Sequence, residues 1–198
     1  SVTIGATTKH AEVANSKEVK KAIPSLAKLA GGIGDAQVRN RGTVGGSIAN
    51  NDPSACYPSA CMALNAIIHT SSRKIEASKF FKGMFETALK KGELIEAVEF
   101  QIPDKSNYQK RPNPASRYAV VGVYLAKHKK EVNVAVTGAK SSVYIDKDLS
   151  KALSSSFSSS AIDGMELDSS EMNSDIHASR EFRASLVVTY AKKAVEAC

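Results

Sequence analysis

The sequence predicts an α+β protein, and three observations support this fold class. Short strand-like and helix-like segments are mixed over the first hundred residues, beginning with a strand pattern at residues 2–6. Three prolines interrupt the chain between residues 103 and 116. Apolar, β-branched segments and a long final helix pattern follow this interruption. We therefore expect two units, residues 1–103 and residues 104–198, with a connecting loop at 103–116.

The elements expected in the first unit follow from the spacing of apolar residues and from the positions of glycine and proline. In chain order they are a strand at 2–6, a helix from about Lys9, a helix after Pro24 that ends at the glycines 31–32, a short helix at 57–64, a hairpin of strands at 66–70 and 73–77, a loop with one helical turn at 80–88, and a strand at 93–102. The last strand stops at Pro103, because proline lacks the N–H group that a strand ladder needs.

The second unit is predicted to be an antiparallel meander that leads into helices. Its strands are expected at 118–126, 131–139 and 142–145, with a lysine-rich turn at 127–130 between the first two. The serine-rich run at 154–160 is expected to be either mobile or a connection between helices. The final helix is expected at 179–197, where the apolar residues on one face are Leu186, Val187, Tyr190, Ala191 and Ala194.

The chain is basic, with a net charge of +7. Much of the excess comes from lysine pairs at 20–21, 90–91, 129–130 and 192–193. A nucleic-acid-binding surface would concentrate such charge on one element and interleave aromatic residues with it. The scattered lysines instead favour solvated surface, so nucleic-acid binding is the least favoured function.

The cysteine and histidine positions do not predict a metal site. The three cysteines, Cys56, Cys61 and Cys198, form no CxxC motif, and the four histidines lack metal-ligand spacing. Free cysteines are typical of a reducing, cytoplasmic location. No apolar run approaches the roughly 18 residues that a membrane span needs.

The segment RNRGTVGGSIANNDP, residues 39–53, is the most informative part of the sequence. It places Gly42, Gly45 and Gly46 close together, with Thr43 and Ser47 beside them. A glycine pair lets backbone N–H groups approach a bound anion, because no Cβ atom intervenes. The alternative is an ordinary tight turn between a helix and a strand. No nucleophile elbow, HExxH motif or P-loop lysine accompanies these glycines, and no catalytic residue is predicted.

The string GDAQVRNRGTVGGSIANNDPSACYPSA resembles the flavin-binding, medium subunit of the molybdenum hydroxylases. The similarity is to the carbon monoxide dehydrogenase type and to the FAD domain of xanthine dehydrogenase. It continues in FFKGMFETAL at 80–89, GELIEAVEFQIP at 92–103, YQK with NPASRYAVVGVYLAK at 108–127, and NSDIHASREFR at 173–183. The resemblance implies the second half of a PCMH-type FAD-binding domain at 1–103. A carbon monoxide dehydrogenase flavoprotein C-terminal-like domain, with a three-stranded antiparallel sheet and a helical bundle, is implied at 104–198.

The same resemblance implies which residues bind FAD. Thr43, Val44, Gly45, Gly46 and Ser47 match the family's second glycine loop, which approaches the FAD diphosphate. Ile33 matches an apolar position beside the flavin. Ile95, with Leu94 and Glu96 as neighbours, lies in the segment that passes near the isoalloxazine ring in this family. Lys110 matches a lysine near that ring, where a cation would stabilise reduced anionic flavin; the alternative is a surface lysine in a basic loop.

Two departures from the family pattern concern the same cofactor. Many relatives carry aspartate, in DPxxD, where this chain has Cys56, and a thiol accepts hydrogen bonds from ribose hydroxyls poorly. Asp52 is present four positions earlier. The family's first glycine-rich loop, which also wraps the diphosphate, is expected to precede Ser1.

The resemblance implies an electron-relay function. Electrons would pass from a large molybdopterin-binding subunit, through 2Fe-2S clusters on a small subunit, to FAD on this chain and then to an external acceptor. Carbon monoxide, aldehydes and N-heterocycles all remain open as substrates of such an assembly. The alternative is a truncated, flavin-free protein that acts as a scaffold or docks a partner.

Overall fold

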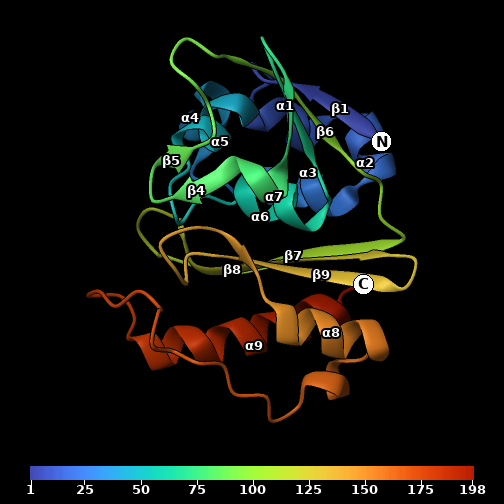
Figure 1. Cartoon of the computed structure of the whole chain (residues 1–198), viewed down its shortest axis with the longest axis vertical. Helices are drawn as coiled ribbons and strands as arrows, with labels where there is room; N and C mark the ends of the chain where they lie inside the picture. The colour runs from blue at the N-terminus through green and yellow to red at the C-terminus, as the bar shows by residue number, and fades with distance from the viewer.

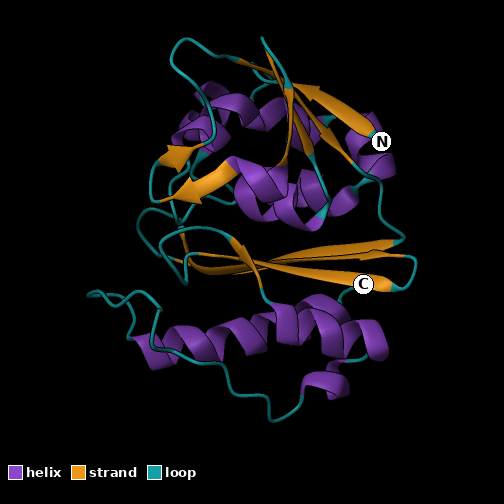
Figure 2. Cartoon of the chain, viewed as in Figure 1, coloured by secondary structure: helices purple, strands orange, loops and turns teal.

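Two four-stranded antiparallel sheets organise the computed structural model, which describes residues 1–198 (Figure 1). The strand order is β1-β6-β2-β3 in the first sheet and β10-β9-β8-β7 in the second. Helices α1 to α7 lie in the first half of the chain, whereas α8 and α9 lie beyond the second sheet (Figure 2). Mixed helix and strand with antiparallel sheets confirm the predicted α+β class.

The first half begins with a strand that pairs far along the chain. β1 runs antiparallel to β6 with Val2 opposite Phe100, so the start of the chain is tied to its middle. The strands of this half are β1 (Val2–Gly5), β2 (Ile67–Thr70), β3 (Lys74–Glu76), β6 (Ile95–Phe100) and the small hairpin β4 (Phe81–Gly83) with β5 (Glu86–Thr87). The helices are α1 (His10–Asn15), α2 (Lys17–Ala22), α3 (Pro24–Gly31), α4 (Ala36–Arg41), α5 (Val44–Asn50), α6 (Tyr57–Ala63) and α7 (Ala77–Phe80).

The second sheet separates two hydrophobic cores. Its strands are β7 (Lys105–Pro112), β8 (Ala119–His128), β9 (Glu131–Thr137) and β10 (Tyr144–Ile145). Tyr124 and Ala135 belong to the core shared with the helices of the first half, whereas Val123 and Val134 belong to the core that includes α8 (Lys147–Ser155) and α9 (Arg180–Glu196). This alternation follows from the two-residue period of a strand. The sheet therefore forms the middle layer of the molecule in Figure 1.

The prediction of a loop at 103–116 is wrong for most of that segment. Residues 105–112 form β7, which pairs with β8 from Lys105 opposite Lys127 to Pro112 opposite Ala119. The prolines stand at the ends of this strand, and none lies between 105 and 111. The sheet consequently has four strands, where the sequence predicted three.

The serine-rich run begins inside a helix that the sequence did not predict. Ser154 belongs to α8 (Lys147–Ser155), and residues 156–158 connect α8 to a 3-10 helix, η1 (Ser159–Ile162). The hydroxyls of Ser150 and Ser154 accept hydrogen bonds from the N–H groups of Val134 and Val132 at the edge of β9. These serines therefore satisfy a strand edge that would otherwise be unpaired.

The first half also differs locally from the prediction. Helices α2 and α4 were not expected, and residues 80–88 contribute the β4–β5 hairpin. The final helix is confirmed at Arg180–Glu196. None of the helices combines the length and the apolar character that crossing a lipid bilayer requires.

Candidate functional site

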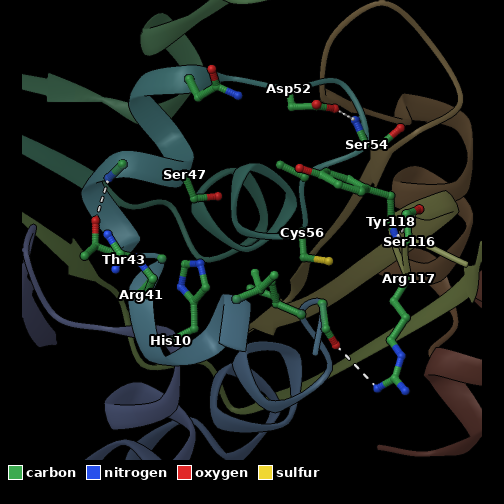
Figure 3. Close-up of a pocket in the computed structure, with 17 residues that line it drawn as sticks. His10, Arg41, Thr43, Ser47, Asp52, Ser54, Cys56, Ser116, Arg117 and Tyr118 are labelled. Atoms are coloured by element: carbon green, nitrogen blue, oxygen red, sulfur yellow. Dashed lines mark hydrogen bonds between the residues drawn. The ribbon is translucent and has the colours of Figure 1, made fainter. Parts of the chain in front are cut away.

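A cavity of about 380 Å³ lies beside helices α4 and α5 (Figure 3). Its walls come from the start of α1, the segment after α3, α4 and α5, the segment 52–56, and the loop 116–118. The last of these follows β7, so residues from both halves of the chain meet here. This size lies within the range of about 300–1,000 Å³ that is usual for small-molecule sites.

Helix α5 begins at one wall of the cavity, and its first amides are already hydrogen-bonded. Thr43 caps the helix, with its Oγ1 accepting from the N–H of Gly46 at 3.1 Å. The N–H of Val44 donates to the Thr8 carbonyl at 3.1 Å, and that of Gly45 donates to the Ala6 carbonyl at 2.8 Å. The predicted glycine loop is thus the first turn of a helix, and these amides are not free to receive an anion.

The glycines of this segment serve different purposes. A Cβ atom on Gly45 would lie 2.6 Å from the Ala6 Cβ and 2.9 Å from its carbonyl oxygen, so Gly45 lets α5 pack against the end of β1. A Cβ atom on Gly42 would lie 2.5 Å from the His10 Nε2. Only Gly42 and Gly46 of the three line the cavity. The space that a Cβ would take is filled by His10 at Gly42 and by the Thr43 hydroxyl at Gly46, so both glycines allow close packing of the cavity wall.

Charged and hydroxyl groups line the remaining walls. Arg41 and Arg117 supply positive charge, and Asp52 supplies one carboxylate, whose Oδ1 accepts from the N–H of Ser54 at 2.8 Å. Ser47, Ser54 and Ser116 add hydroxyl groups. Two cations against one anion favour a ligand that carries negative charge.

Lys110 holds three segments together next to the cavity. Its Nζ donates to the carbonyls of Gly32 at 2.7 Å and Arg117 at 2.8 Å, and it lies 3.6 Å from the Cys56 Sγ. Arg117 also has a left-handed φ of 62°, a conformation that Lys110 helps to hold through the carbonyl. Lys110 itself does not line the cavity.

The structure brings together six of the ten residues that the resemblance implied. Those that line the cavity are Ile33, Thr43, Gly46, Ser47, Asp52 and Cys56. Val44 and Gly45 are buried in the first turn of α5 and do not line the cavity. Ile95 lies at the start of β6, paired with Thr70 and half-buried, and it does not line the cavity.

His10 lines the cavity, although the sequence did not identify it. It is 4 % exposed, its Nδ1 has no hydrogen-bond partner, and its ring centroid lies 5.3 Å from that of Tyr57. Burial lowers the pKa of the imidazole, which favours its neutral form. Arg117 and Tyr118 were also missed as wall residues. An isolated antiparallel β-bridge between Lys9 and Thr43 brings His10 close to α5. No local pattern in the sequence predicts this contact.

Comparisons with known proteins give a consistent result. Residues 1–104 match the model of the FAD binding domain in molybdopterin dehydrogenase. The chain is 41 % identical over 131 residues to the glyceraldehyde dehydrogenase medium chain of Sulfolobus acidocaldarius. This alignment covers 63 % of this chain and 47 % of that protein. It is 30 % identical over 210 residues to the nicotine 6-hydroxylase medium subunit of Paenarthrobacter nicotinovorans, covering 98 % of this chain and 74 % of that subunit.

A solved structure shows the same fold. A chain of the reconstituted CO dehydrogenase from Oligotropha carboxidovorans matches with a TM-score of 0.86 and 24 % identity. The match covers 98 % of this chain and 73 % of the other. The alignment to the glyceraldehyde dehydrogenase medium chain, by contrast, spans about half of that relative's length.

Proposed function

Since the chain belongs to the family of FAD-binding domains of molybdopterin dehydrogenases, we propose that its cavity forms part of an FAD site in the flavin subunit of a molybdenum-dependent dehydrogenase. The observation that carries this proposal is the meeting of two arginines, three serine hydroxyls and three glycines in one cavity. The predicted medium-chain type of subunit is confirmed by the relatives.

The donor set of the cavity fits a dinucleotide. Arg41 and Arg117 would neutralise the diphosphate, because one guanidinium group can donate two parallel hydrogen bonds to phosphate oxygens. The Ser47 hydroxyl would donate to sugar or phosphate oxygens, the Asp52 carboxylate would accept from sugar hydroxyls, and the half-buried Ile33 offers apolar surface to a ring. Thr43 holds α5 in place as its cap and also lines the cavity.

Bound FAD supplies redox chemistry, since a flavin takes up electrons and releases them to another acceptor. The chain's own residues bind and orient the cofactor and exclude water from it. Lys110 ties the loop at Arg117 to the end of α3, which keeps opposite walls at a fixed separation. No side chain of this chain is assigned as a general acid or base.

The assembly around the site extends the same proposal. A large molybdopterin-binding subunit and a small 2Fe-2S subunit would deliver electrons to FAD, and an external acceptor would remove them. We place this assembly in the cytoplasm. Carbon monoxide, an aldehyde or an N-heterocycle would be oxidised on the large subunit.

One observation favours the second candidate, a flavin-free scaffold or docking protein. The N–H groups of Val44 and Gly45 are bonded to the carbonyls of Thr8 and Ala6, so the first turn of α5 offers few free donors to a phosphate. The two candidates differ in a direct way, because only the first retains a flavin.

An FAD-binding measurement on the purified chain separates them. FAD is added, excess is removed by gel filtration, and flavin absorbance is compared with protein absorbance. A yellow protein with near-equimolar flavin supports the proposed site. A chain that elutes colourless, and that does not quench FAD fluorescence in titration, would remove the flavin function from it.

A further inference from the structure

Cys56 differs from the other two thiols in its surroundings. It is 5 % exposed, it lines the cavity, and Figure 3 shows its sulfur directed into the space between Ser47 and Arg117. Cys61 is fully buried in α6, and burial raises the pKa of its thiol strongly. Cys198 is half-buried at the last position of the chain, and burial raises the pKa of its thiol as well. Cys56 is therefore the cysteine that lines the proposed cofactor cavity, whereas Cys198 lines a separate pocket with Lys21, Pro24 and Lys105.

A cation lies against this thiol. The Lys110 Nζ is 3.6 Å from the Cys56 Sγ, and its remaining bonds go to the carbonyls of Gly32 and Arg117. Those carbonyls are neutral, so the positive charge of Lys110 has no carboxylate partner. Thiols become reactive in electropositive, partly accessible surroundings of this kind.

A second polar group, the Tyr108 phenol, is a neighbour of the Cys56 thiol. The Tyr108 Oη has no hydrogen-bond partner, although the residue is only 5 % exposed. Burial, together with the neighbouring Cys56, raises the pKa of this phenol, so it remains a hydrogen-bond donor. A buried hydroxyl without a partner carries a desolvation cost, which an acceptor oxygen on the sulfur would relieve.

We propose that Cys56 is a peroxide-sensitive thiol, whose oxidation to sulfenic acid is stabilised by Lys110 and Tyr108. The sulfur attacks one oxygen of a hydroperoxide, a new S–O bond forms, and the O–O bond breaks. Sulfur loses two electrons, which reduce the peroxide, and the leaving oxygen takes the thiol proton, so hydrogen peroxide gives water and an organic hydroperoxide gives an alcohol. A small peroxide can reach the sulfur through the cavity, whereas Cys61 has no such path.

Oxidation at this position has a consequence that rests on the proposed function. The new oxygen would occupy cavity volume next to Ser47 and Arg117, where we place the cofactor. Peroxide would then lower FAD retention, and bound FAD would protect Cys56. Oxidation of the thiol itself does not depend on FAD.

The test uses the full chain, reduced and then exposed to hydrogen peroxide with dimedone as the sulfenic acid trap. Peptide mass spectrometry measures the adduct at each cysteine separately. We expect Cys56 to be labelled about tenfold faster than Cys61 and Cys198. Equal labelling of Cys56 and Cys198, or no adduct on Cys56, would overturn the proposal. The adduct is measured without FAD, so a failure to bind flavin leaves this result independent.

Two variants test the stabilising groups. Tyr108→Phe removes only the Oη atom, and Lys110→Met removes the charge while keeping a similar length. Both are expected to reduce the yield of Cys56 sulfenic acid, and Lys110→Arg is expected to restore part of it. Circular dichroism of each variant verifies folding. A folded Tyr108→Phe protein and a folded Lys110→Met protein that both label like the parent would contradict the stabilising roles.

A separate experiment measures FAD retention and compares each peroxide-treated protein with its own untreated sample. Peroxide is expected to lower FAD retention in the parent and in Cys198→Ser. In Cys56→Ser, peroxide is expected to cause no further change relative to the untreated variant. An equal peroxide-induced loss in Cys56→Ser would assign the effect to another group and remove Cys56 as the switch.

Discussion

Gly45 and Ala6 are in direct backbone contact: the N–H of Gly45 donates to the Ala6 carbonyl at 2.8 Å, and a Cβ at Gly45 would meet the Ala6 Cβ at 2.6 Å. This contact fixes α5 against the end of β1. The glycine that appears from the sequence to admit a phosphate is therefore required by packing between two elements of the same chain.

Replacing Gly45 tests this assignment. Gly45→Ala should lower the free energy of unfolding by about 1–3 kcal/mol, because the added methyl group forces α5 away from Ala6. Urea unfolding followed by circular dichroism measures the change. Gly31→Ala is the matched control, since its Cβ would lie 3.7 Å from the Ala14 Cβ, an ordinary contact. Unchanged stability in Gly45→Ala would show that α5 does not pack as described.

The contribution of positive charge in the cavity to FAD binding can be tested at Arg41. Arg41→Gln should weaken FAD binding about tenfold or more, because a charge-assisted hydrogen bond to phosphate is worth about 1.5–3 kcal/mol. Fluorescence titration with FAD at low and high salt measures the affinity. Arg180→Gln makes the same change of charge on an exposed arginine of α9 and should have little effect. Equal affinities for both variants would remove Arg41 from the site.

The Glu93 cluster predicts an acid-sensitive stability. The Arg73 guanidinium, followed by the Thr70 hydroxyl and the Lys90 N–H, holds the pKa of the Glu93 carboxyl well below its usual value of 4.5. Its contribution to stability is complete above that value and is lost as the pH falls toward the folded pKa. Glu93→Gln should flatten the acid limb of the curve of unfolding free energy against pH.

The matched control for this cluster is Glu76→Gln. Glu76 pairs with Lys79 at 2.8 Å, but both side chains are largely exposed, so its removal should leave the acid limb in place. An acid limb of the same slope in the parent and in Glu93→Gln would contradict the prediction.

Arg183 is the third stability test. Its side chain is 3 % exposed, donates to the carbonyls of Val120 and Gly138, and pairs with Asp175 at 2.6 Å. Arg183→Met should lower the free energy of unfolding by about 2 kcal/mol or more, since the Val120 carbonyl loses this donor and the Gly138 carbonyl keeps only the longer bond from Asn173. Thermal unfolding measures the change, with the exposed Arg180→Met as control. A loss no larger than that of the control would contradict this role.

The sequence by itself determined the elements whose signals are local. Proline positions and the two-residue period of apolar residues predicted strands β8 and β9 and the end of β6. The apolar face of residues 186–194 predicted helix α9. The ordered motifs also led to the flavin-subunit family, which the family match confirms. The segment 39–56 supplied most of the cavity wall, because residues close in sequence stay close in space.

Only the tertiary structure decided which groups face the cavity. His10 and Arg117 reach it through the Lys9–Thr43 bridge and through the Lys110 contact, which join residues far apart in the chain. Residues 105–112 form the strand β7 because they pair with β8 along their whole length. The sequence of residues 105–112 alone does not indicate this pairing. The role of Gly45 likewise depends on Ala6. The local sequence shows only that the backbone at Gly45 is free of a side chain, whereas the long-range contact shows that Ala6 occupies the space this leaves.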